Sequence, residues 1–303
     1  MGHSYQAGRR KFLTNSLKAA GVTALIGLPQ FSMAGDLNFS KKDYTGQDLI
    51  DIILKEIPGA PFPNTVDTIK CGNASNKVSG IVTTMFPTVN VIEATAKLKA
   101  NFIIAHEPTF YNHEDNRDFV PNNRVVAQKI ELLQQYGITI WRFHDGWHAH
   151  NPDGIFHGVL MKTNWLQYYE PGKSVLKIPA TTVKAIIEKL KSTLGIKMVR
   201  MIGNPDQICE RISLIPGAAG AEMQIGLVEN ERPDLLIVGE LREWETAEYI
   251  RDRISFGEKT ALIVLGHAQS EEAGMEWLVE WLAPRVPGLT ITHLASDNPF
   301  SWV

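Results

Sequence analysis

The chain has 303 residues, of which 44% are hydrophobic and 21% are charged, and its formal net charge is −3. This composition predicts a globular protein with one large domain or two lobes, and it argues against a broad basic surface of the kind that binds nucleic acid. Two cysteines, Cys71 and Cys209, are too few for a zinc cluster or a disulfide framework, and a single disulfide between them is left open.

The first 34 residues differ in character from the rest of the chain. Arg9 and Arg10 precede a weakly apolar segment at 19–28, and small residues follow at 32–34. This layout is typical of an export signal, and the paired arginines favour the twin-arginine type. The alternative is a tag followed by an ordinary basic helix. We expect residues 1–34 to direct export to the periplasm or cell envelope, and the apolar segment is too short to span a membrane.

From about residue 44 the chain alternates helical and strand-like segments. Apolar spacing predicts helices at 46–57, 88–100 and 122–137, with strands at 78–85, 101–105 and 138–143. A stretch rich in proline and glycine near 165–180 separates a second series. That series has helices at 181–195, 242–254 and 270–286, and strands at 197–203, 211–217, 234–240, 261–267 and 289–295. The helix at 181–195 has a threonine cap and a glycine stop.

This alternation predicts an α/β fold with two lobes, in which mixed or parallel sheets are flanked by helices. We expect one domain over 42–303. Lobe 1 covers about 42–168 together with 260–303, and lobe 2 covers about 175–258.

Polar side chains interrupt the chain where four predicted strands end. His106 and Glu107 follow the strand at 101–105, and His144 and Asp145 follow the strand at 138–143. Glu240 ends a third strand, and a histidine with a glutamate four residues later, His267 and Glu271, ends the fourth. In open α/β sheets ligands bind at the carboxyl ends of the strands, so we expect a cleft between the lobes at this edge.

The residue types at these strand ends point to metal chemistry. Imidazole and carboxylate groups together bind zinc, manganese, iron or nickel. Five such ligands exceed what one tetrahedral ion with an open position needs, and they suit two divalent ions.

The chain resembles the Nif-three-like family, also called the GTP cyclohydrolase I type 2-like proteins, from about residue 44 to 300. The matching segments are VDTIKCGN at 66–73, NFIIAHEP at 101–108, HDGWHAHNPDG at 144–154, PGAAG at 216–220, VGE at 238–240 and GHAQSE at 266–271. The resemblance implies a two-lobed fold with a dinuclear metal site and assembly as a homo-oligomer, in this family often a toroidal hexamer.

The chain departs from the family pattern at three places. Glu107 stands where the family has a second histidine, His148 stands where it has an aspartate, and Trp244 stands where it often has a histidine. The first departure replaces an imidazole by a carboxylate, and the second replaces a carboxylate by an imidazole. The numbers of imidazole and carboxylate ligands are therefore unchanged. The expected ligands are therefore His106, Glu107, His148, His267 and Glu271.

Two neighbouring residues have other expected roles. A competing assignment uses Asp145 in place of His148. In the preferred assignment His144 and Asp145 hold His148 in orientation from behind.

These assignments predict a hydrolase that uses a metal-activated water on a small-molecule substrate, with Glu240 as the catalytic group for proton transfer or substrate orientation. The label GTP cyclohydrolase comes from the resemblance alone. The alternatives are a non-catalytic metal-binding or scaffold protein, and a relic fold that has lost its metals. The glycine-rich PGAAG loop could hold a phosphate through its backbone amides.

Overall fold

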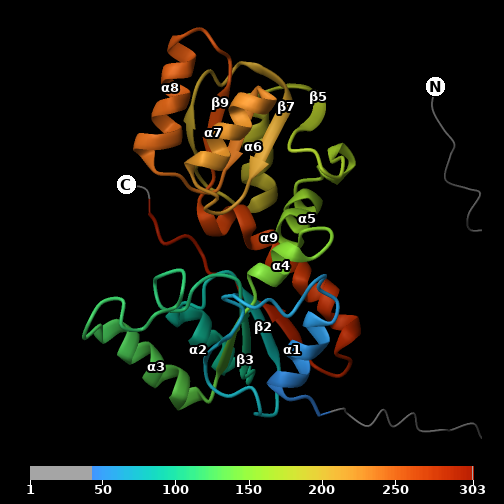
Figure 1. Ribbon diagram of the computed structural model, residues 1–303, viewed down its shortest axis with the longest axis vertical. Helices are drawn as coiled ribbons and strands as arrows, with labels where there is room; N and C mark the ends of the chain where they lie inside the picture. The colour runs from blue at the N-terminus through green and yellow to red at the C-terminus, as the bar shows by residue number, and fades with distance from the viewer. Residues whose placement is uncertain (1–42, 302) are drawn as a thin grey trace, which may run out of the picture. The chain divides into compact units, whose positions relative to one another are not determined.

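The computed structural model describes residues 43–301 and residue 303, so the expected export signal at 1–34 lies outside the described residues. In the described part, the strands form two mixed five-stranded sheets with helices beside them (Figure 1). The predicted α/β class, with mixed sheets flanked by helices, is confirmed.

The first sheet has the strand order β1-β4-β3-β2-β10. Its strands are β1 (Ile69–Cys71), β2 (Ile81–Thr84), β3 (Phe102–Ala105), β4 (Thr139–Arg142) and β10 (Ile291–His293). Only β1 runs antiparallel to its neighbour. Because β2, β3 and β4 are parallel, the residues that follow them emerge at the same edge of the sheet.

The helices of this half are α1 (Gly46–Leu54), α2 (Val89–Lys97) and α3 (Arg124–Tyr136). They begin within two residues of the predicted positions, and α1 and α2 end three residues earlier than predicted. Thr45 and Asp48 form a capping box at the start of α1, and Asn123 caps α3. Gly137 ends α3 with a φ of 62°, in the left-handed region that glycine adopts without strain.

The second sheet has the strand order β5-β7-β8-β9-β6. Its strands are β5 (Leu176–Thr182), β6 (Arg200–Ile202), β7 (Ile208–Ile215), β8 (Leu235–Val238) and β9 (Ala261–Val264). The central three strands are parallel and both edge strands are antiparallel. The helices of this half are α6 (Val183–Leu194), α7 (Ala221–Glu231) and α8 (Glu248–Ser255), with a π-helical turn, η2 (Glu243–Ala247), before α8. Thr182 and Gly195 cap α6, as its sequence predicts.

The sheet to which β9 belongs differs from the lobe assignment expected from the sequence. The sequence grouped the region from residue 260 onward with the first lobe, whereas β9 pairs with β8 and β6 in the second sheet. The crossing to the first sheet occurs later, along α9 (His267–Leu282), after which a short turn, η3 (Ala283–Arg285), leads to β10. A contiguous apolar strand fits either sheet, so its sequence does not decide between them.

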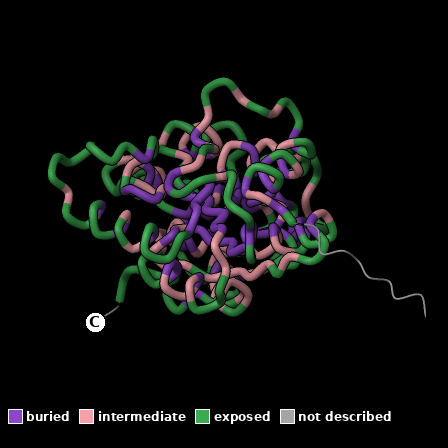
Figure 2. Tube along the Cα trace, turned by 90° about the horizontal axis from the view of Figure 1, so that it is seen from below, coloured by how far each residue is buried: buried purple, intermediate pink, exposed green. Residues whose placement is uncertain are grey.

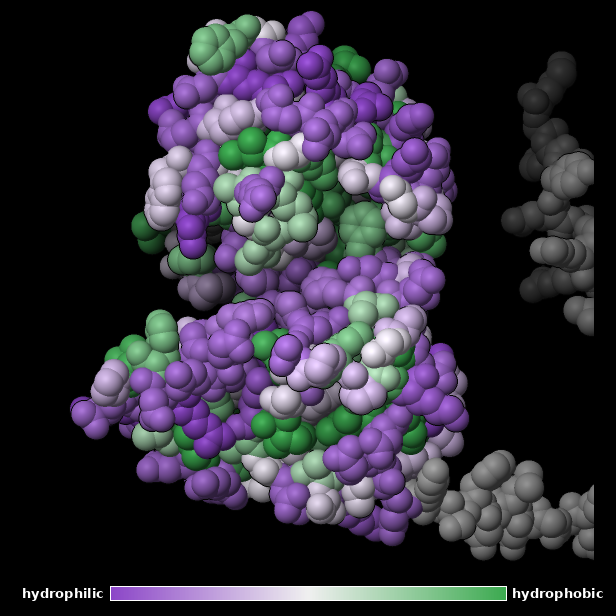
Figure 3. Space-filling view, in the orientation of Figure 1, coloured by the Kyte–Doolittle hydropathy of each residue, from purple (hydrophilic) through white to green (hydrophobic). Residues whose placement is uncertain are grey.

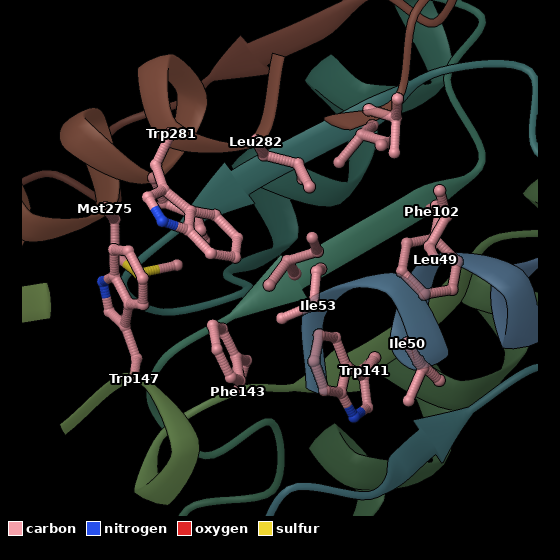
Figure 4. Close-up of a cluster of buried hydrophobic side chains, with 14 of the residues drawn as sticks. Leu49, Ile50, Ile53, Phe102, Trp141, Phe143, Trp147, Met275, Trp281 and Leu282 are labelled. Carbon is pink, nitrogen blue, oxygen red and sulfur yellow. The ribbon is translucent and has the colours of Figure 1, made fainter. Parts of the chain in front are cut away.

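α9 takes part in both hydrophobic cores. Met275, Trp281 and Leu282 join the core of the first sheet, and Ala273 joins that of the second. Figure 4 shows the first group facing Phe143 and side chains of α1. Figure 2 shows buried segments running through the middle of the described chain under exposed loops.

Two short helices precede the second sheet and pack close to α9. They are α4 (Asp145–Ala149) and α5 (Gly154–Lys162), and a turn, η1 (Leu166–Tyr168), follows them. A Cβ added at Gly158 would lie 2.6 Å from the Cα of Gly274. Glycines at these two positions therefore allow α5 and α9 to approach closely.

Several smaller expectations concern single residues. Trp141 and Trp147 are almost completely buried in the core of the first sheet. Cys71 and Cys209 are buried free thiols, so the disulfide that the sequence left open does not form.

The surface of the described chain is ordinary for a globular protein. Hydrophilic residues dominate the face seen in Figure 3, with apolar residues in small groups among them. None of the helices in residues 43–301 combines the length and apolar character needed to cross a membrane.

Candidate metal centre

The residues that follow β3 keep the path of the strand for two positions. The amide N–H of His106 donates to Thr84 O at 3.1 Å, and that of Glu107 donates to Met85 O at 2.9 Å. Pro108 has no N–H and cannot continue the pairing. Both side chains are therefore fixed at the strand edge, where His106 is fully buried and Glu107 is 7% exposed.

His267 and Glu271 reach the same place from β9. Their helix α9 begins at His267, three residues earlier than the sequence suggested, so the pair occupies positions i and i+4 on one face. His267 Nε2 lies 3.2 Å from Glu271 Oε2. The same nitrogen lies 3.2 Å from Glu107 Oε1, which joins residues that are 160 positions apart in sequence.

Four histidines are held in a common way, each by its Nδ1 atom. The Nδ1 partners are a backbone carbonyl for one and carboxylates for the other three. The pairs are His106 with Phe143 O at 3.2 Å, His144 with Asp145 at 2.8 Å, His148 with Asp153 at 2.9 Å and His267 with Glu240 at 3.3 Å. An Nδ1–H that donates in this way leaves a lone pair on Nε2, which is the tautomer that binds metals.

The free donor atoms converge. Ligand atoms of His106, His144 and His148 lie within 4.8 Å of one another, and so do those of His106, Glu107 and Glu271. His144 Nε2 lies 3.7 Å from Glu107 Oε1, and His106 Nε2 lies 3.8 Å from Glu271 Oε2. Such separations are close to the roughly 3–3.5 Å between neighbouring ligands that metal–ligand bonds of about 2.1 Å produce.

Two of these donor atoms are buried, His106 Nε2 and Glu271 Oε2: in the described structure the first has no hydrogen-bond partner, and the second lies 3.2 Å from His267 Nε2. Buried polar atoms are normally paired, since an unpaired one costs about 1–3 kcal/mol. The donor set thus fits a divalent cation, which would satisfy both atoms at once.

The protonation pattern of the metal-free chain supports the same fit. Burial disfavours the charged form of His267, but hydrogen bonds to Glu107, Glu240 and Glu271 outweigh burial and raise its pKa to about 12. Burial also opposes ionisation of Glu107, yet the hydrogen bond from His267 and the neighbouring histidines lower its pKa to about 2. The carboxylates therefore hold a cation at this position, and in the metal-free chain that cation is the imidazolium.

His106 has the opposite behaviour. Complete burial, with a smaller contribution from His148, lowers its pKa well below the ordinary value. It is neutral at physiological pH and offers its Nε2 lone pair without the loss of a proton, as a metal ligand must.

Asp145 does not share the converging space. Its Oδ1 atom binds His144 Nδ1, and its Oδ2 atom accepts from the Thr65 hydroxyl at 2.8 Å and from the Val66 amide at 3.2 Å. Both oxygens are thus engaged away from the other donors. The geometry favours His148 over the competing assignment of Asp145.

The expected roles of His144 and Asp145 differ from the contacts that the structure shows. Both were expected to orient His148, whereas Asp145 contacts His144 Nδ1, and Asp153 contacts His148 Nδ1. His144 also directs Nε2 toward Glu107, so it has the position of a ligand. Asp153 lies within the quoted HDGWHAHNPDG segment, but spacing alone did not distinguish it from a helix cap, which it also is.

Asp67 is a second residue to which the sequence assigned no role. Its carboxylate accepts the backbone N–H groups of His144, Asp145 and Gly146 at 2.7–2.9 Å. It fixes the first turn of α4 and hence the direction of His148. The feature of the sequence that could have identified Asp67 is its position in VDTIKCGN, one of the segments that resemble the family.

The guanidinium group of Arg142 lies beside the carboxylate of Glu107. This fully buried side chain donates to His106 O at 3.1 Å and to His113 O, and its Nη2 lies 3.7 Å from Glu107 Oε2. It also contacts Asp115, whose Oδ1 accepts the amides of Thr109 and Phe110. The unusual carboxylate at position 107 is therefore matched by a buried cation, which sequence analysis had included in an apolar strand.

The glycine-rich loop packs against Glu271. A Cβ added at Gly217, whose φ is +67°, would lie 2.7 Å from Glu271 Cδ and nearer still to Oε1. The Gly217 amide donates to Ser270 Oγ at 2.9 Å. The loop thus packs against α9 at Glu271, which is a different contact from the phosphate cradle that its composition had suggested.

Glu240 is positioned through its backbone and its side chain. Its carbonyl accepts from Gln224 Nε2 at 3.0 Å, and Gln224 in turn accepts from Thr246 in the π-helical turn η2 at 2.6 Å. Its carboxylate binds His267 and is half exposed. Trp244, the third departure from the family pattern, is 73% exposed and has no contact with this cluster in the described structure.

A cavity of about 1040 Å³ opens beside these residues. Glu107, Glu240 and His267 line it, together with Phe86, Lys129 and the C-terminal residues 296–301. Its volume is at the upper end of the range for small-molecule sites.

The fold and the donor set define a class: a two-sheet α/β protein with candidate His/Glu metal-binding groups beside a large cavity. Residues 67–299 match the family model described as Duf34/NIF3 (NGG1p interacting factor 3), which covers more than half of the chain. The protein belongs to this family.

Known proteins of similar sequence and structure agree. The chain is 22% identical over 236 residues to a GTP cyclohydrolase 1 type 2 homolog of Clostridium perfringens, a match that covers 74% of this chain and 86% of the relative. A hypothetical protein of Staphylococcus aureus superposes with a TM-score of 0.66 at 16% identity, over 86% of this chain and all of that one. A Bacillus cereus protein related to NIF3 gives 0.67 at 13% identity, with the same coverage.

Proposed function

We propose that this protein is a hydrolase that depends on two divalent metal ions and acts on a small molecule in the adjacent cavity. The main supporting observation is the convergence of histidine Nε2 and carboxylate oxygen atoms at the wall of that cavity, among them His106 Nε2, which is buried without a hydrogen-bond partner in the described structure. The proposed ligands are His106, Glu107, His144, His148, His267 and Glu271.

The donor atoms divide into two overlapping groups that share His106, which favours two ions over one. Divalent ions in such a site supply Lewis-acid polarisation and lower the pKa of water. The chain's own contribution is orientation, because Asp145, Asp153 and Glu240 each fix one imidazole through its Nδ1–H.

Glu240 is the proposed proton-transfer group. Its carboxylate lines the cavity and is half exposed, so it can reach both substrate and solvent. The hydrogen bond from His267 is the largest contribution to its pKa, which it lowers, and Glu240 is therefore ionised and able to accept a proton.

The test is a comparison of the metal-loaded full chain with the His267→Ala, Glu271→Ala double variant. The substrates are a phosphoester (bis-p-nitrophenyl phosphate), a cyclic amide (dihydrouracil) and GTP, which the name of the Clostridium relative suggests. Metal-dependent turnover of one substrate by the wild type, absent in the variant, is the expected result. Metal binding without turnover of any of the three favours the second candidate.

That second candidate is a metal-binding protein without catalysis, and one observation favours it. His106 is fully buried and Glu271 is only 3% exposed, as in a closed structural site. A catalytic site keeps a coordination position open to water. The two candidates are distinguished by the relaxation rate of water protons in a solution of the manganese-loaded protein. A catalytic site keeps a metal-bound water that exchanges rapidly with solvent and raises this rate, whereas a closed site does not.

We also propose that residues 1–34 direct export, which places the substrate in the cell envelope. The support is the Arg9–Arg10 pair ahead of the apolar segment. Replacing both arginines by lysine should leave the protein in the cytoplasmic fraction, and secretion of that variant at the wild-type level would contradict the proposal.

A further inference from the structure

Lys129, on α3, occupies an unusual place for a lysine. Its side chain lines the cavity although the residue is only 4% exposed. Its Nζ donates to Thr109 O at 2.8 Å, and no carboxylate of the described residues lies within ion-pair distance. An ammonium group has three donors, so this buried cation has donor capacity to spare at the cavity wall.

Lys129 differs from two other buried cations, Lys70 and Arg142. Those two both contact Asp115, and Arg142 also approaches Glu107, whereas Lys129 forms no ion pair among the described residues. One Arg142 nitrogen, Nη2, is also without a hydrogen-bond partner in the described structure.

A buried and incompletely paired cation is costly. Burial lowers the pKa of Lys129 to about 8, and the more distant Asp115 offsets only part of this effect. An anion at the cavity wall would supply the missing partner.

The other charged groups that line the cavity are already engaged. Glu107 and Glu240 contact His267, and Arg200 pairs with Glu243 at 2.7 Å. Asp297 lies in the exposed C-terminal segment.

Large apolar side chains that are exposed to solvent also gather here. Val89, Tyr111, Met198 and Phe300 are between 42% and 75% exposed, and all four line this cavity. Tyr111 also stands beside Lys129, with Nζ 5.2 Å from the ring centroid. Exposed apolar groups that line a concave site are typical of ligand binding.

We propose that the cavity binds a small molecule with an apolar body and an anionic group, carboxylate or phosphate, and that Lys129 binds the anionic group. If the protein is the proposed hydrolase, this molecule is its substrate. The inference that the cavity binds such a molecule does not depend on that function. The apolar body lies along Phe86 and Tyr111, between Lys129 and His267, whose ring Phe86 contacts edge-on.

The test uses two fluorescent probes that differ by one charge. 1-Anilinonaphthalene-8-sulfonate carries a sulfonate on an aromatic body, and N-phenyl-1-naphthylamine is the same body without the sulfonate. Both are titrated into the full chain in the presence of a chelator, so that the anion cannot bind to divalent ions. The variants are Lys129→Met and, as the matched control, Lys97→Met, which removes an exposed lysine outside the cavity.

Lys129→Met should weaken binding of the sulfonate probe by about tenfold or more, because one charge-assisted hydrogen bond is lost. The uncharged probe should bind both proteins alike, and Lys97→Met should behave as the wild type. Equal sulfonate binding by wild type and Lys129→Met would overturn the proposal. A parallel loss of both probes in a folded variant would overturn it as well, since Lys129 would then act through the shape of the cavity.

Two further measurements use the wild type alone. Displacement of the sulfonate probe by inorganic phosphate or by acetate identifies the anionic group, and displacement by neither contradicts the proposal. The anion that displaces the probe more effectively should slow reductive methylation of Lys129 and leave that of Lys97 unchanged. The extent of methylation is measured by peptide mass spectrometry. If Lys129→Met does not fold, this measurement tests the proposal in its place. An unchanged rate of methylation at Lys129 would overturn the proposal.

These results are independent of catalysis. Probe binding requires neither metal nor turnover, so an inactive protein with a Lys129-dependent anion site would refute the hydrolase and leave the ligand class standing. Metal-dependent turnover without that site would do the reverse.

Discussion

The contact between Gly217 and Glu271 allows a sharp test of the candidate metal centre. A Cβ at position 217 would lie 2.7 Å from Glu271 Cδ, a distance that real side chains do not tolerate. In Gly217→Ala the carboxylate must therefore leave its place, where Oε2 lies 3.2 Å from His267 Nε2. Displacing a ligand or its support lowers metal affinity by roughly 10–100-fold.

The backbone makes a separate contribution to this variant. Gly217 has a φ of +67°, and a residue with a Cβ in that region costs roughly 1–2 kcal/mol of folding free energy. Gly220→Ala is the matched control, because Gly220 lies in the same loop with a φ of +80° and has open space where its Cβ would be. It also places a Cβ at a positive φ, but without contact with Glu271.

The assays are zinc titration against a competing chelator and urea unfolding of the metal-free proteins. Both variants should lose stability, and Gly217→Ala alone should lose metal affinity. If Gly217→Ala is folded and binds zinc as tightly as Gly220→Ala, Glu271 is not a ligand and the assignment of the site is wrong.

Three other predictions follow from the contacts of the site. Asp153→Asn keeps a side-chain cap on α5 but removes the carboxylate behind His148, so zinc affinity should fall by about tenfold with unfolding by urea nearly unchanged. Arg142→Met removes a buried cation shared by Asp115 and Glu107, which then depend on Lys70 and His267, and should reduce the free energy of unfolding by about 3 kcal/mol in urea. A loss under 1 kcal/mol, roughly that of an exposed pair, would show that the buried pairing with Arg142 is unimportant. His267, with a folded pKa of about 12 against 6.5 unfolded, stabilises the metal-free chain fully below pH 6.5 and progressively less as pH rises toward 12. The stability difference between wild type and His267→Gln should therefore shrink as pH rises from 6.5 to 9, and a difference that grows would contradict the paired imidazolium.

The sequence predicted those parts of the fold that depend on local patterns. Apolar strands ending in His106-Glu107 and in His267 were recognisable, because contiguous apolar runs and abrupt polar ends need no knowledge of partners. The caps at Thr182 and Gly195 were predicted for the same reason. The short edge strands β1 and β5 were not predicted, since three paired residues or a strand containing Pro179 have no distinctive pattern.

The groups that orient the ligands depend on contacts between distant residues. Arg142 lies in the apolar segment ITIWRF, and its burial depends on Asp115, 27 positions away. Lys129 lies on an amphipathic helix, where a lysine is normally on the solvent side. The loop that follows β3 supplies their partners, Asp115 for Arg142 and the Thr109 carbonyl for Lys129.

The most direct test of the account is the metal content of the full chain and of its His267→Ala, Glu271→Ala double variant, measured by elemental mass spectrometry after reconstitution with zinc, manganese or iron. The account predicts about two ions per chain in the wild type, and loss of both in a variant that remains folded. A wild type that retains no metal after reconstitution, or a double variant that retains as much as the wild type, would contradict the proposed centre.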